Sequence, residues 1–137
     1  MRTADQKRLA VYKTKPFSRF ARKARIADAE LWEAARLASL GQIDADLGGG
    51  VIKQRIARAG EGKSGGSRTI LLFRFKGRAV FVYGFEKKSL ANIKADELDA
   101  FRELADVILG YSEAEMAQRT SDGALIEIEP PRENRDD

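Results

Sequence analysis

The sequence contains neither cysteine nor histidine among its 137 residues. Their absence excludes disulfides, thiol nucleophiles, catalytic histidines and zinc or haem sites that need either side chain. A metal site made only of carboxylates stays open, but no motif requires one, and we expect neither a metal nor a cofactor. The longest apolar run covers only residues 79–83, whereas a bilayer-spanning helix needs about 20 residues. We therefore expect no membrane contact.

The composition otherwise suits one folded domain. The chain is 43% hydrophobic and 34% charged, with 12 glycines and 3 prolines, which is unlike disordered or collagen-like chains. No apolar stretch follows the charged N-terminus, so we expect no secretory signal and a cytoplasmic protein. We treat residues 1–137 as a single domain with frayed ends at 1–8 and 132–137.

Charge is distributed very unevenly along the chain. Residues 1–94 hold 21 basic and 8 acidic side chains, whereas residues 95–137 hold 4 and 13. Within the first part, residues 51–94 carry 11 basic and 2 acidic side chains. Such a block is typical of proteins that bind a polyanion, most often nucleic acid. A basic surface that only confers solubility is the simpler alternative.

Hydrophobic periodicity predicts a strand and two helices in the first 50 residues. Residues 9–13 fit a short strand, and Pro16 suits the first turn of a helix because its missing N–H is not needed there. A second helix is predicted from about residue 28 to Gly41. The glycine run 48–50 marks the turn that follows.

The rest of the chain predicts a β unit and then two helices. Strands at 51–57, 68–75 and 79–85, joined by short turns, indicate an antiparallel meander. The first of the two helices is predicted to start at an Asp96 N-cap and to end at Gly110, the second to follow the Ser112-x-x-Glu115 capping box, and an edge strand to span 125–129. These elements together predict an α+β fold.

Glycines and cations combine in the segment 60–68, GEGKSGGSR. It is not a P-loop, which needs G-x-x-x-x-G-K-[ST] at the start of a helix, because a strand follows here. A flexible hairpin loop is the simpler alternative. However, eight basic side chains lie on or beside the three predicted strands: Lys53, Arg55, Arg58, Lys63, Arg68, Arg74, Lys87 and Lys88.

Three segments together resemble the RelE/HigB family of type II toxins: DLGGGVIKQRI at 46–56, GKSGGSRTI at 62–70 and FVYGFEKKSLANI at 81–93. The resemblance is strongest to the branch with a GKSGG-x-R loop and a GF-x-K strand end. Ser67 departs from the pattern, since an aromatic residue is frequent there. The resemblance implies a curled, mostly antiparallel sheet packed against two N-terminal helices, with C-terminal helices. It also implies a metal-independent, ribosome-dependent mRNA endonuclease that a cognate antitoxin silences.

RNA cleavage is chemically possible without histidine. The 2′-OH is the nucleophile, so the protein must supply in-line placement, a base, charge stabilisation and an acid. A lysine acts as a base near neutral pH only when neighbouring cations lower its pKa. The arginine fork suits phosphate oxygens.

The resemblance assigns the basic residues to roles. Arg68 corresponds to the phosphate-binding arginine, Lys53 and Arg55 to the basic pair on the preceding strand, and Lys87 or Lys88 to the basic residue after the last strand. The predicted catalytic set is Lys53, Arg55, Arg68 and Lys87. The predicted RNA-binding set is Lys63, Arg58, Phe85 and Lys88. Phe85 and Tyr83 are candidate stacking platforms, or core residues.

Two other functions stay open at this point. Related ParE-like toxins attack DNA gyrase without cutting RNA, and a non-catalytic RNA-binding module would also carry a basic sheet. The density of Lys and Arg on the strand unit favours the nuclease. Its expected partners are a cognate antitoxin, the ribosome and mRNA.

Overall fold

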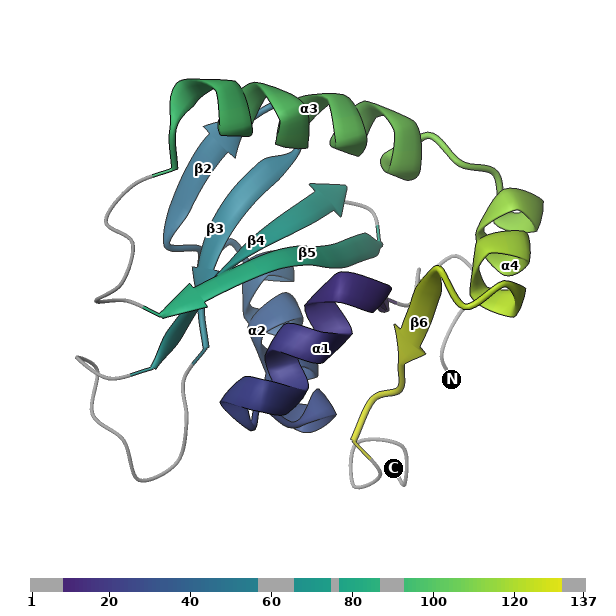
Figure 1. Ribbon diagram of the computed structural model, residues 1–137, viewed down its shortest axis with the longest axis horizontal. Helices are drawn as coiled ribbons and strands as arrows, with labels where there is room; N and C mark the ends of the chain where they lie inside the picture. The colour runs from purple at the N-terminus through teal and green to yellow at the C-terminus, as the bar shows by residue number, and fades with distance from the viewer. Residues whose placement is uncertain (1–8, 57–65, 75–76, 87–92, 132–137) are drawn as a thin grey trace.

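The computed structural model describes residues 9–56, 66–74, 77–86 and 93–131 (Figure 1). Four residues of the predicted site lie outside these ranges: Arg58, Lys63, Lys87 and Lys88. The chain ends that were predicted to be frayed, residues 1–8 and 132–137, also lie outside them. The strands are β1 Ala10–Thr14, β2 Ala45–Gly48, β3 Val51–Arg55, β4 Ser67–Arg74, β5 Arg78–Glu86 and β6 Leu125–Ile128. The helices are α1 Lys15–Ala24, α2 Asp28–Ser39, α3 Ala95–Leu109 and α4 Glu113–Ser121.

The six described strands form one mixed, mostly antiparallel sheet in the order β2-β3-β4-β5-β1-β6. The meander β3-β4-β5 is antiparallel, as predicted. β1 then lies between β5 and β6, parallel to β5 and antiparallel to β6. The α+β class and a RelE-like arrangement of the sheet and helices are confirmed. β2 was not predicted, because its residues ADLG carry little strand propensity.

Helices cover both faces of the sheet. The predicted alternation along β4 is confirmed, since Leu71 and Phe73 face α1 and α2 whereas Ile70 and Leu72 face α3 and α4. Each face has its own apolar cluster, as expected for a strand buried on both sides. The predicted packing of the sheet against two N-terminal helices is therefore correct, and α3 and α4 form a second layer (Figure 1).

The glycine run between β2 and β3 is explained by its backbone and by α3. Gly48, Gly49 and Gly50 all have positive φ, which favours glycine. A Cβ at Gly49 would lie 3.0 Å from Arg102 Cγ, and one at Gly50 would lie 3.0 Å from Leu109 Cδ1. The run therefore allows both a left-handed turn and the close approach of α3.

Two of the three helix starts predicted from a specific residue are confirmed. Pro16 lies in the first turn of α1, where the Thr14 hydroxyl also accepts a hydrogen bond from the Phe17 N–H, and Ser112 with Glu115 forms the predicted capping box of α4. The prediction for α3 is wrong, because its N-cap is Lys94 rather than Asp96. The Glu97 side chain accepts a hydrogen bond from the Lys94 N–H, so the helix begins before Asp96.

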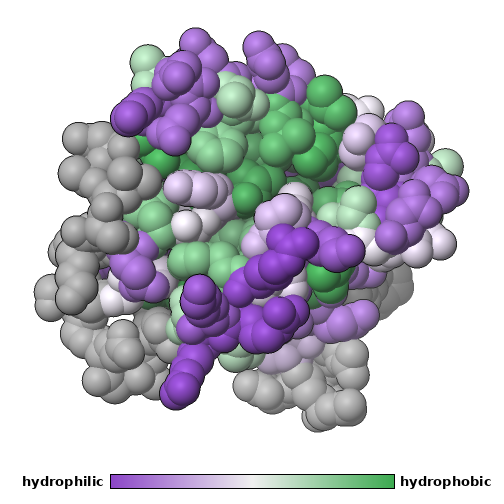
Figure 2. Space-filling view, in the orientation of Figure 1, coloured by the Kyte–Doolittle hydropathy of each residue, from purple (hydrophilic) through white to green (hydrophobic). Residues whose placement is uncertain are grey.

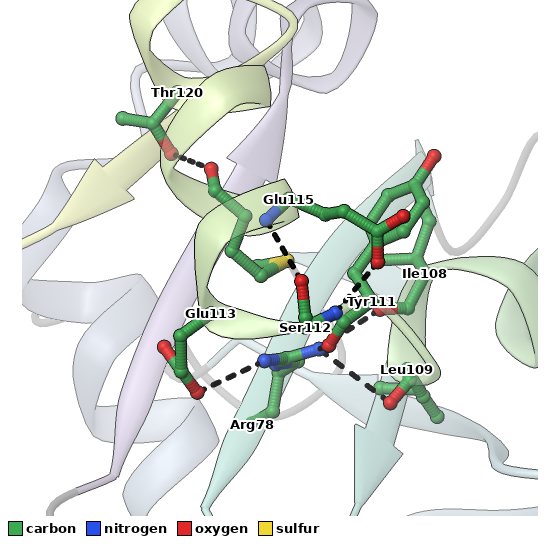
Figure 3. Close-up of polar contacts among 9 residues, drawn as sticks. Arg78, Ile108, Leu109, Tyr111, Ser112, Glu113, Glu115 and Thr120 are labelled. Atoms are coloured by element: carbon green, nitrogen blue, oxygen red, sulfur yellow. Dashed lines mark hydrogen bonds and ion pairs between the residues drawn. The ribbon is translucent and has the colours of Figure 1, made fainter.

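A buried arginine on β5 fixes the other end of α3 (Figure 3). Arg78 is 7% exposed, and its Nη1 donates hydrogen bonds to the carbonyl oxygens of Ile108 at 3.0 Å and Tyr111 at 2.8 Å. Its Nη2 lies 3.2 Å from a carboxylate oxygen of Glu113. Arg78 thus adds a charged donor to carbonyls at the C-terminal end of α3 and in the segment after it, and joins α3 to the start of α4.

Two kinds of feature are absent from the described residues. No helix there combines the length and the apolar character needed to cross a membrane. The same residues include no group of three or more acidic side chains arranged to hold a metal ion.

Candidate functional site

A row of predicted site residues crosses three strands. Arg55 on β3 pairs with Arg68 on β4, and Arg68 pairs with Phe85 on β5. Directly opposed residues of antiparallel strands present their side chains on the same face, with Cβ atoms about 4.5–5.5 Å apart. Phe85 belongs to the apolar cluster on the α3 side of the sheet. The register therefore brings Arg55, Arg68 and Phe85 together on that side; we call them the arginine row.

A second row lies beside the arginine row on the same face. Lys53 pairs with Ile70, and Ile70 pairs with Tyr83. Figure 1 shows that the ends of β3 and β5 and the start of β4 gather at one end of the sheet, whereas α3 crosses nearer the other end. The pairing of β3, β4 and β5 thus brings together four of the eight predicted site residues at this end of the sheet: Lys53, Arg55, Arg68 and Phe85.

A bulge in β5 places Tyr83 and Phe85 on the same face of the sheet as the arginine row. The register with β4 shifts between Ile70, which pairs with Tyr83, and Leu71, which pairs with Phe81. Val82 is the extra residue of β5, and it shifts the alternation of side chains between the two faces of the sheet. As a result Tyr83 and Phe85 lie on the same face as the arginine row, and Gly84 lies on the α1 face. Bulges commonly redirect side chains in this way.

Gly84 makes room for a helix behind the site. A Cβ at Gly84 would lie 2.2 Å from Phe20 Cε2 on α1, so only glycine lets the ring pack there. The glycine of the GF-x-K motif therefore has a packing role on the α1 side of the sheet.

One nitrogen of the Arg68 guanidinium forms an ion pair, and another has no hydrogen-bond partner among the described residues. Its Nε lies 3.2 Å from Asp44 Oδ2, and its side chain is 14% exposed. Its Nη1 is buried and has no hydrogen-bond partner among the described residues. A buried charged donor without an acceptor costs more than the about 1–3 kcal/mol of a neutral group. The guanidinium is thus suited to bind an oxygen-rich anion.

Asp44, which the sequence did not single out, is held by the backbone of β3 and by Gln54. The Asp44 N–H donates hydrogen bonds to the Lys53 carbonyl at 3.2 Å and to Gln54 Oε1 at 3.1 Å. Gln54 is 4% exposed, and its Nε2 donates hydrogen bonds to the Ala34 carbonyl of α2 and to the Gln42 carbonyl. This buried amide therefore fixes the segment that presents Asp44 to Arg68.

The other two cations of the site have no acidic partner in the described part of the chain. Lys53 and Arg55 are half-buried, and no ion pair found among the described residues includes either of them. Three cationic side chains on adjacent strands, of which only Arg68 is paired, leave this face positively charged. Their charges favour binding of a phosphate chain.

Aromatic side chains border the cations on one side. Tyr83 is 37% exposed and Phe85 is 7% exposed; their ring centroids lie 6.0 Å apart, and Tyr83 lies 5.6 Å from Phe101 of α3. Tyr83 therefore offers more ring surface than Phe85, most of which packs in the core. An exposed ring beside unpaired cations is the arrangement used to bind single-stranded nucleic acid.

Comparison with known proteins identifies the family of the chain. A search of curated proteins finds no match to the chain. The family profile described as the RelE toxin of the RelE / RelB toxin–antitoxin system matches residues 9–128. This match covers all the described strands and helices, including both rows of the site. The chain therefore belongs to the RelE toxin family and is the toxin of a toxin–antitoxin system.

Proposed function

We propose that this toxin is a metal-independent endoribonuclease that cleaves mRNA on the ribosome, and that the arginine row and Lys53 form its site. The observation that carries the proposal is Arg68, a half-buried guanidinium held at Nε with a buried Nη1 that has no acceptor among the described residues. Family membership supports the toxin role. The proposed partners are a cognate antitoxin, the ribosome and mRNA.

Arg68 has the role of binding the scissile phosphate. Asp44 holds its Nε, so the guanidinium is oriented before the substrate arrives, and Nη1 keeps its hydrogen-bonding capacity for a phosphate oxygen. Bidentate hydrogen bonds to phosphate oxygens are charge-assisted, and they strengthen as negative charge builds in the transition state. This preorganisation is the main catalytic contribution that we assign to the described residues.

The neighbouring residues bind and place the strand. Lys53 and Arg55 add charge beside the phosphate, and Tyr83 offers its exposed ring to a base. Lys87, and Arg58, Lys63 and Lys88 as RNA-binding residues, stay predictions from the sequence, because they lie outside the described residues. The 2′-OH of the RNA supplies the nucleophile.

Dependence on the ribosome follows from the chemistry of the site. Its members are lysine and arginine, which in their ordinary state are already protonated at neutral pH and therefore accept a proton poorly, so precise placement of the 2′-OH must come from a partner that presents the message. We expect purified toxin to cut naked RNA weakly or not at all. Efficient cutting of naked RNA would contradict ribosome dependence, and inhibition of cutting by EDTA would contradict a metal-independent mechanism.

The test compares Arg68→Ala with Arg74→Ala, an exposed arginine at the opposite end of the same strand. Loss of one preorganised donor typically lowers the rate by about 10²–10³. Primer extension on mRNA in a translation reaction should show this loss for Arg68→Ala and near wild-type cutting for Arg74→Ala. Arg68→Lys should restore little, because an ammonium cannot form the two parallel bonds.

The controls separate the competing functions. Circular dichroism and antitoxin binding must show that Arg68→Ala is folded. A folded Arg68→Ala toxin with wild-type cleavage would remove Arg68 from the site. DNA damage that requires gyrase, without mRNA cuts, would establish the ParE-like alternative instead, and ribosome binding without cuts would indicate a non-catalytic module.

A further inference from the structure

A second group of cations lies on α1, away from the arginine row. Lys15, Arg19, Arg22 and Lys23 are all exposed, and the helix sequence KPFSRFARKA contains no acidic residue. At 3.6 residues per turn these four side chains share one face, which extends about 12 Å along the helix. We call them the α1 stripe. Figure 2 shows hydrophilic residues gathered over the region where α1 lies in Figure 1.

The charges of the α1 stripe are not neutralised by the described part of the chain. None of its four side chains forms an ion pair with a described carboxylate. The nearby Asp28 is already paired with Lys13 at 2.8 Å. The stripe therefore presents four positive charges to an external anion.

The stripe and the arginine row lie on opposite sides of the sheet. The apolar side of α1 packs on the first cluster, where Phe17 stacks on Phe81 at a centroid distance of 5.3 Å. Phe20 of the same helix covers Gly84. The sheet thus separates α1 from the face that carries Arg68. The α1 stripe and the arginine row are therefore two separate surfaces, and one ligand group cannot contact both at once.

The character of the stripe indicates which polyanion it fits. A protein interface usually has an apolar centre, but no large exposed hydrophobic residue among those described lies on α1. Unpaired bases need aromatic platforms, and Phe17 is buried while Phe20 packs against the core. Cations without apolar or aromatic neighbours suit a phosphate backbone whose bases are already paired.

We propose that the α1 stripe binds the phosphate backbone of double-stranded RNA, as a second RNA contact separate from the cleavage site. Duplex RNA is recognised largely by its shape and its phosphates, and a helix that carries four cations supplies such contacts without base specificity. Such a contact would hold the toxin on a structured RNA while the other side of the sheet acts on the message.

The test measures binding to a 20-base-pair RNA duplex by fluorescence anisotropy at several salt concentrations. The double variant Arg19→Glu/Arg22→Glu is compared with Arg74→Glu/Lys94→Glu, which makes the same change in net charge at exposed positions outside α1. We expect the stripe variant to bind about tenfold more weakly and the slope of log K against log salt to be smaller by about 2. The control variant should bind nearly as wild type does.

Further measurements decide between RNA and other partners. An unstructured 20-nucleotide strand should show a much smaller difference between the two variants; an equal difference would overturn the choice of a duplex. Loss of antitoxin binding with unchanged duplex binding would assign the stripe to a protein partner and overturn the proposal. The milder Arg19→Gln/Arg22→Gln variant should show the same trend, which guards against an effect of misfolding.

The outcome is independent of the proposed cleavage chemistry. Binding of the duplex is measured without any cleavage step, and the α1 stripe lies on the other side of the sheet from the arginine row. If cleavage by the wild-type toxin were not observed but the stripe variant still lost duplex binding, the proposed function would fail and the α1 interface would stand.

Discussion

Replacement of Arg78 should destabilise the fold strongly although Arg78 lies outside the arginine row. Its Nη1 makes two short hydrogen bonds, to the carbonyls of Ile108 and Tyr111. A hydrogen bond that includes a charged group contributes about 1.5–3 kcal/mol, so the two together contribute about 3–6 kcal/mol. Arg78→Met fills most of the volume but leaves both carbonyls without this donor. The loss is large beside the about 5–15 kcal/mol that stabilises a typical domain.

Urea unfolding followed by circular dichroism measures the loss directly. The matched control is Glu113→Gln, which removes the ion pair from Arg78 but leaves the buried hydrogen bonds in place. The Glu113 side chain is 92% exposed, so this control should lower the free energy of unfolding by less than about 1 kcal/mol. If Arg78→Met cost no more than Glu113→Gln, the carbonyl contacts at the end of α3 would not stabilise the protein as argued.

Two further predictions concern packing and pH. Gly84→Ala should lower the free energy of unfolding by about 1–3 kcal/mol because its Cβ overlaps the Phe20 ring. Phe20→Leu in the same chain should recover part of this loss. If the losses of unfolding free energy from the two single variants simply added in the double variant, the overlap would be refuted. Burial, together with the charges of Glu127 and Glu113, raises the pKa of Tyr12 above its ordinary value near 10. The resulting stabilisation is full below about pH 10 and is lost as the pH rises through the folded-state pKa. Unfolding at pH 8 and pH 10.5 should therefore show a larger decline for the wild type than for Tyr12→Phe, and equal declines would contradict the shift.

The elements with strong local signals were predictable. The alternation along β4 gave both of its faces correctly, and Ser112 with Glu115 marked the start of α4. The position of β1 between β5 and β6 was not predictable, because strand pairing depends on contacts between distant segments that no local pattern encodes. The N-cap of α3 was wrong for a local reason, since Glu97 reaches back to the Lys94 N–H and starts the helix earlier than Asp96.

The sequence named the residues of the candidate site, whose roles stay predictions, but it did not give their arrangement. The motifs pointed to Arg55 and Arg68, and the register of the single pair β3–β4 places them side by side. The ion pair of Arg68 with Asp44 depends on the unpredicted segment before β2 and on the buried amide of Gln54. The bulge that turns Tyr83 toward the site also has no clear signal in an apolar run of valines and aromatics.

The place of β1 in the sheet has a consequence for synthesis of the chain. β1 is made first, yet its neighbours are β5 and β6, and its Val11 pairs with Ile128. The edge of the sheet formed by β1 and β6 therefore stays incomplete until residue 128 has been synthesised, and contacts between such distant residues form slowly. A nascent chain with this strand order cannot complete its six-stranded sheet before β6 has been synthesised, although five of the six strands are already present by residue 86.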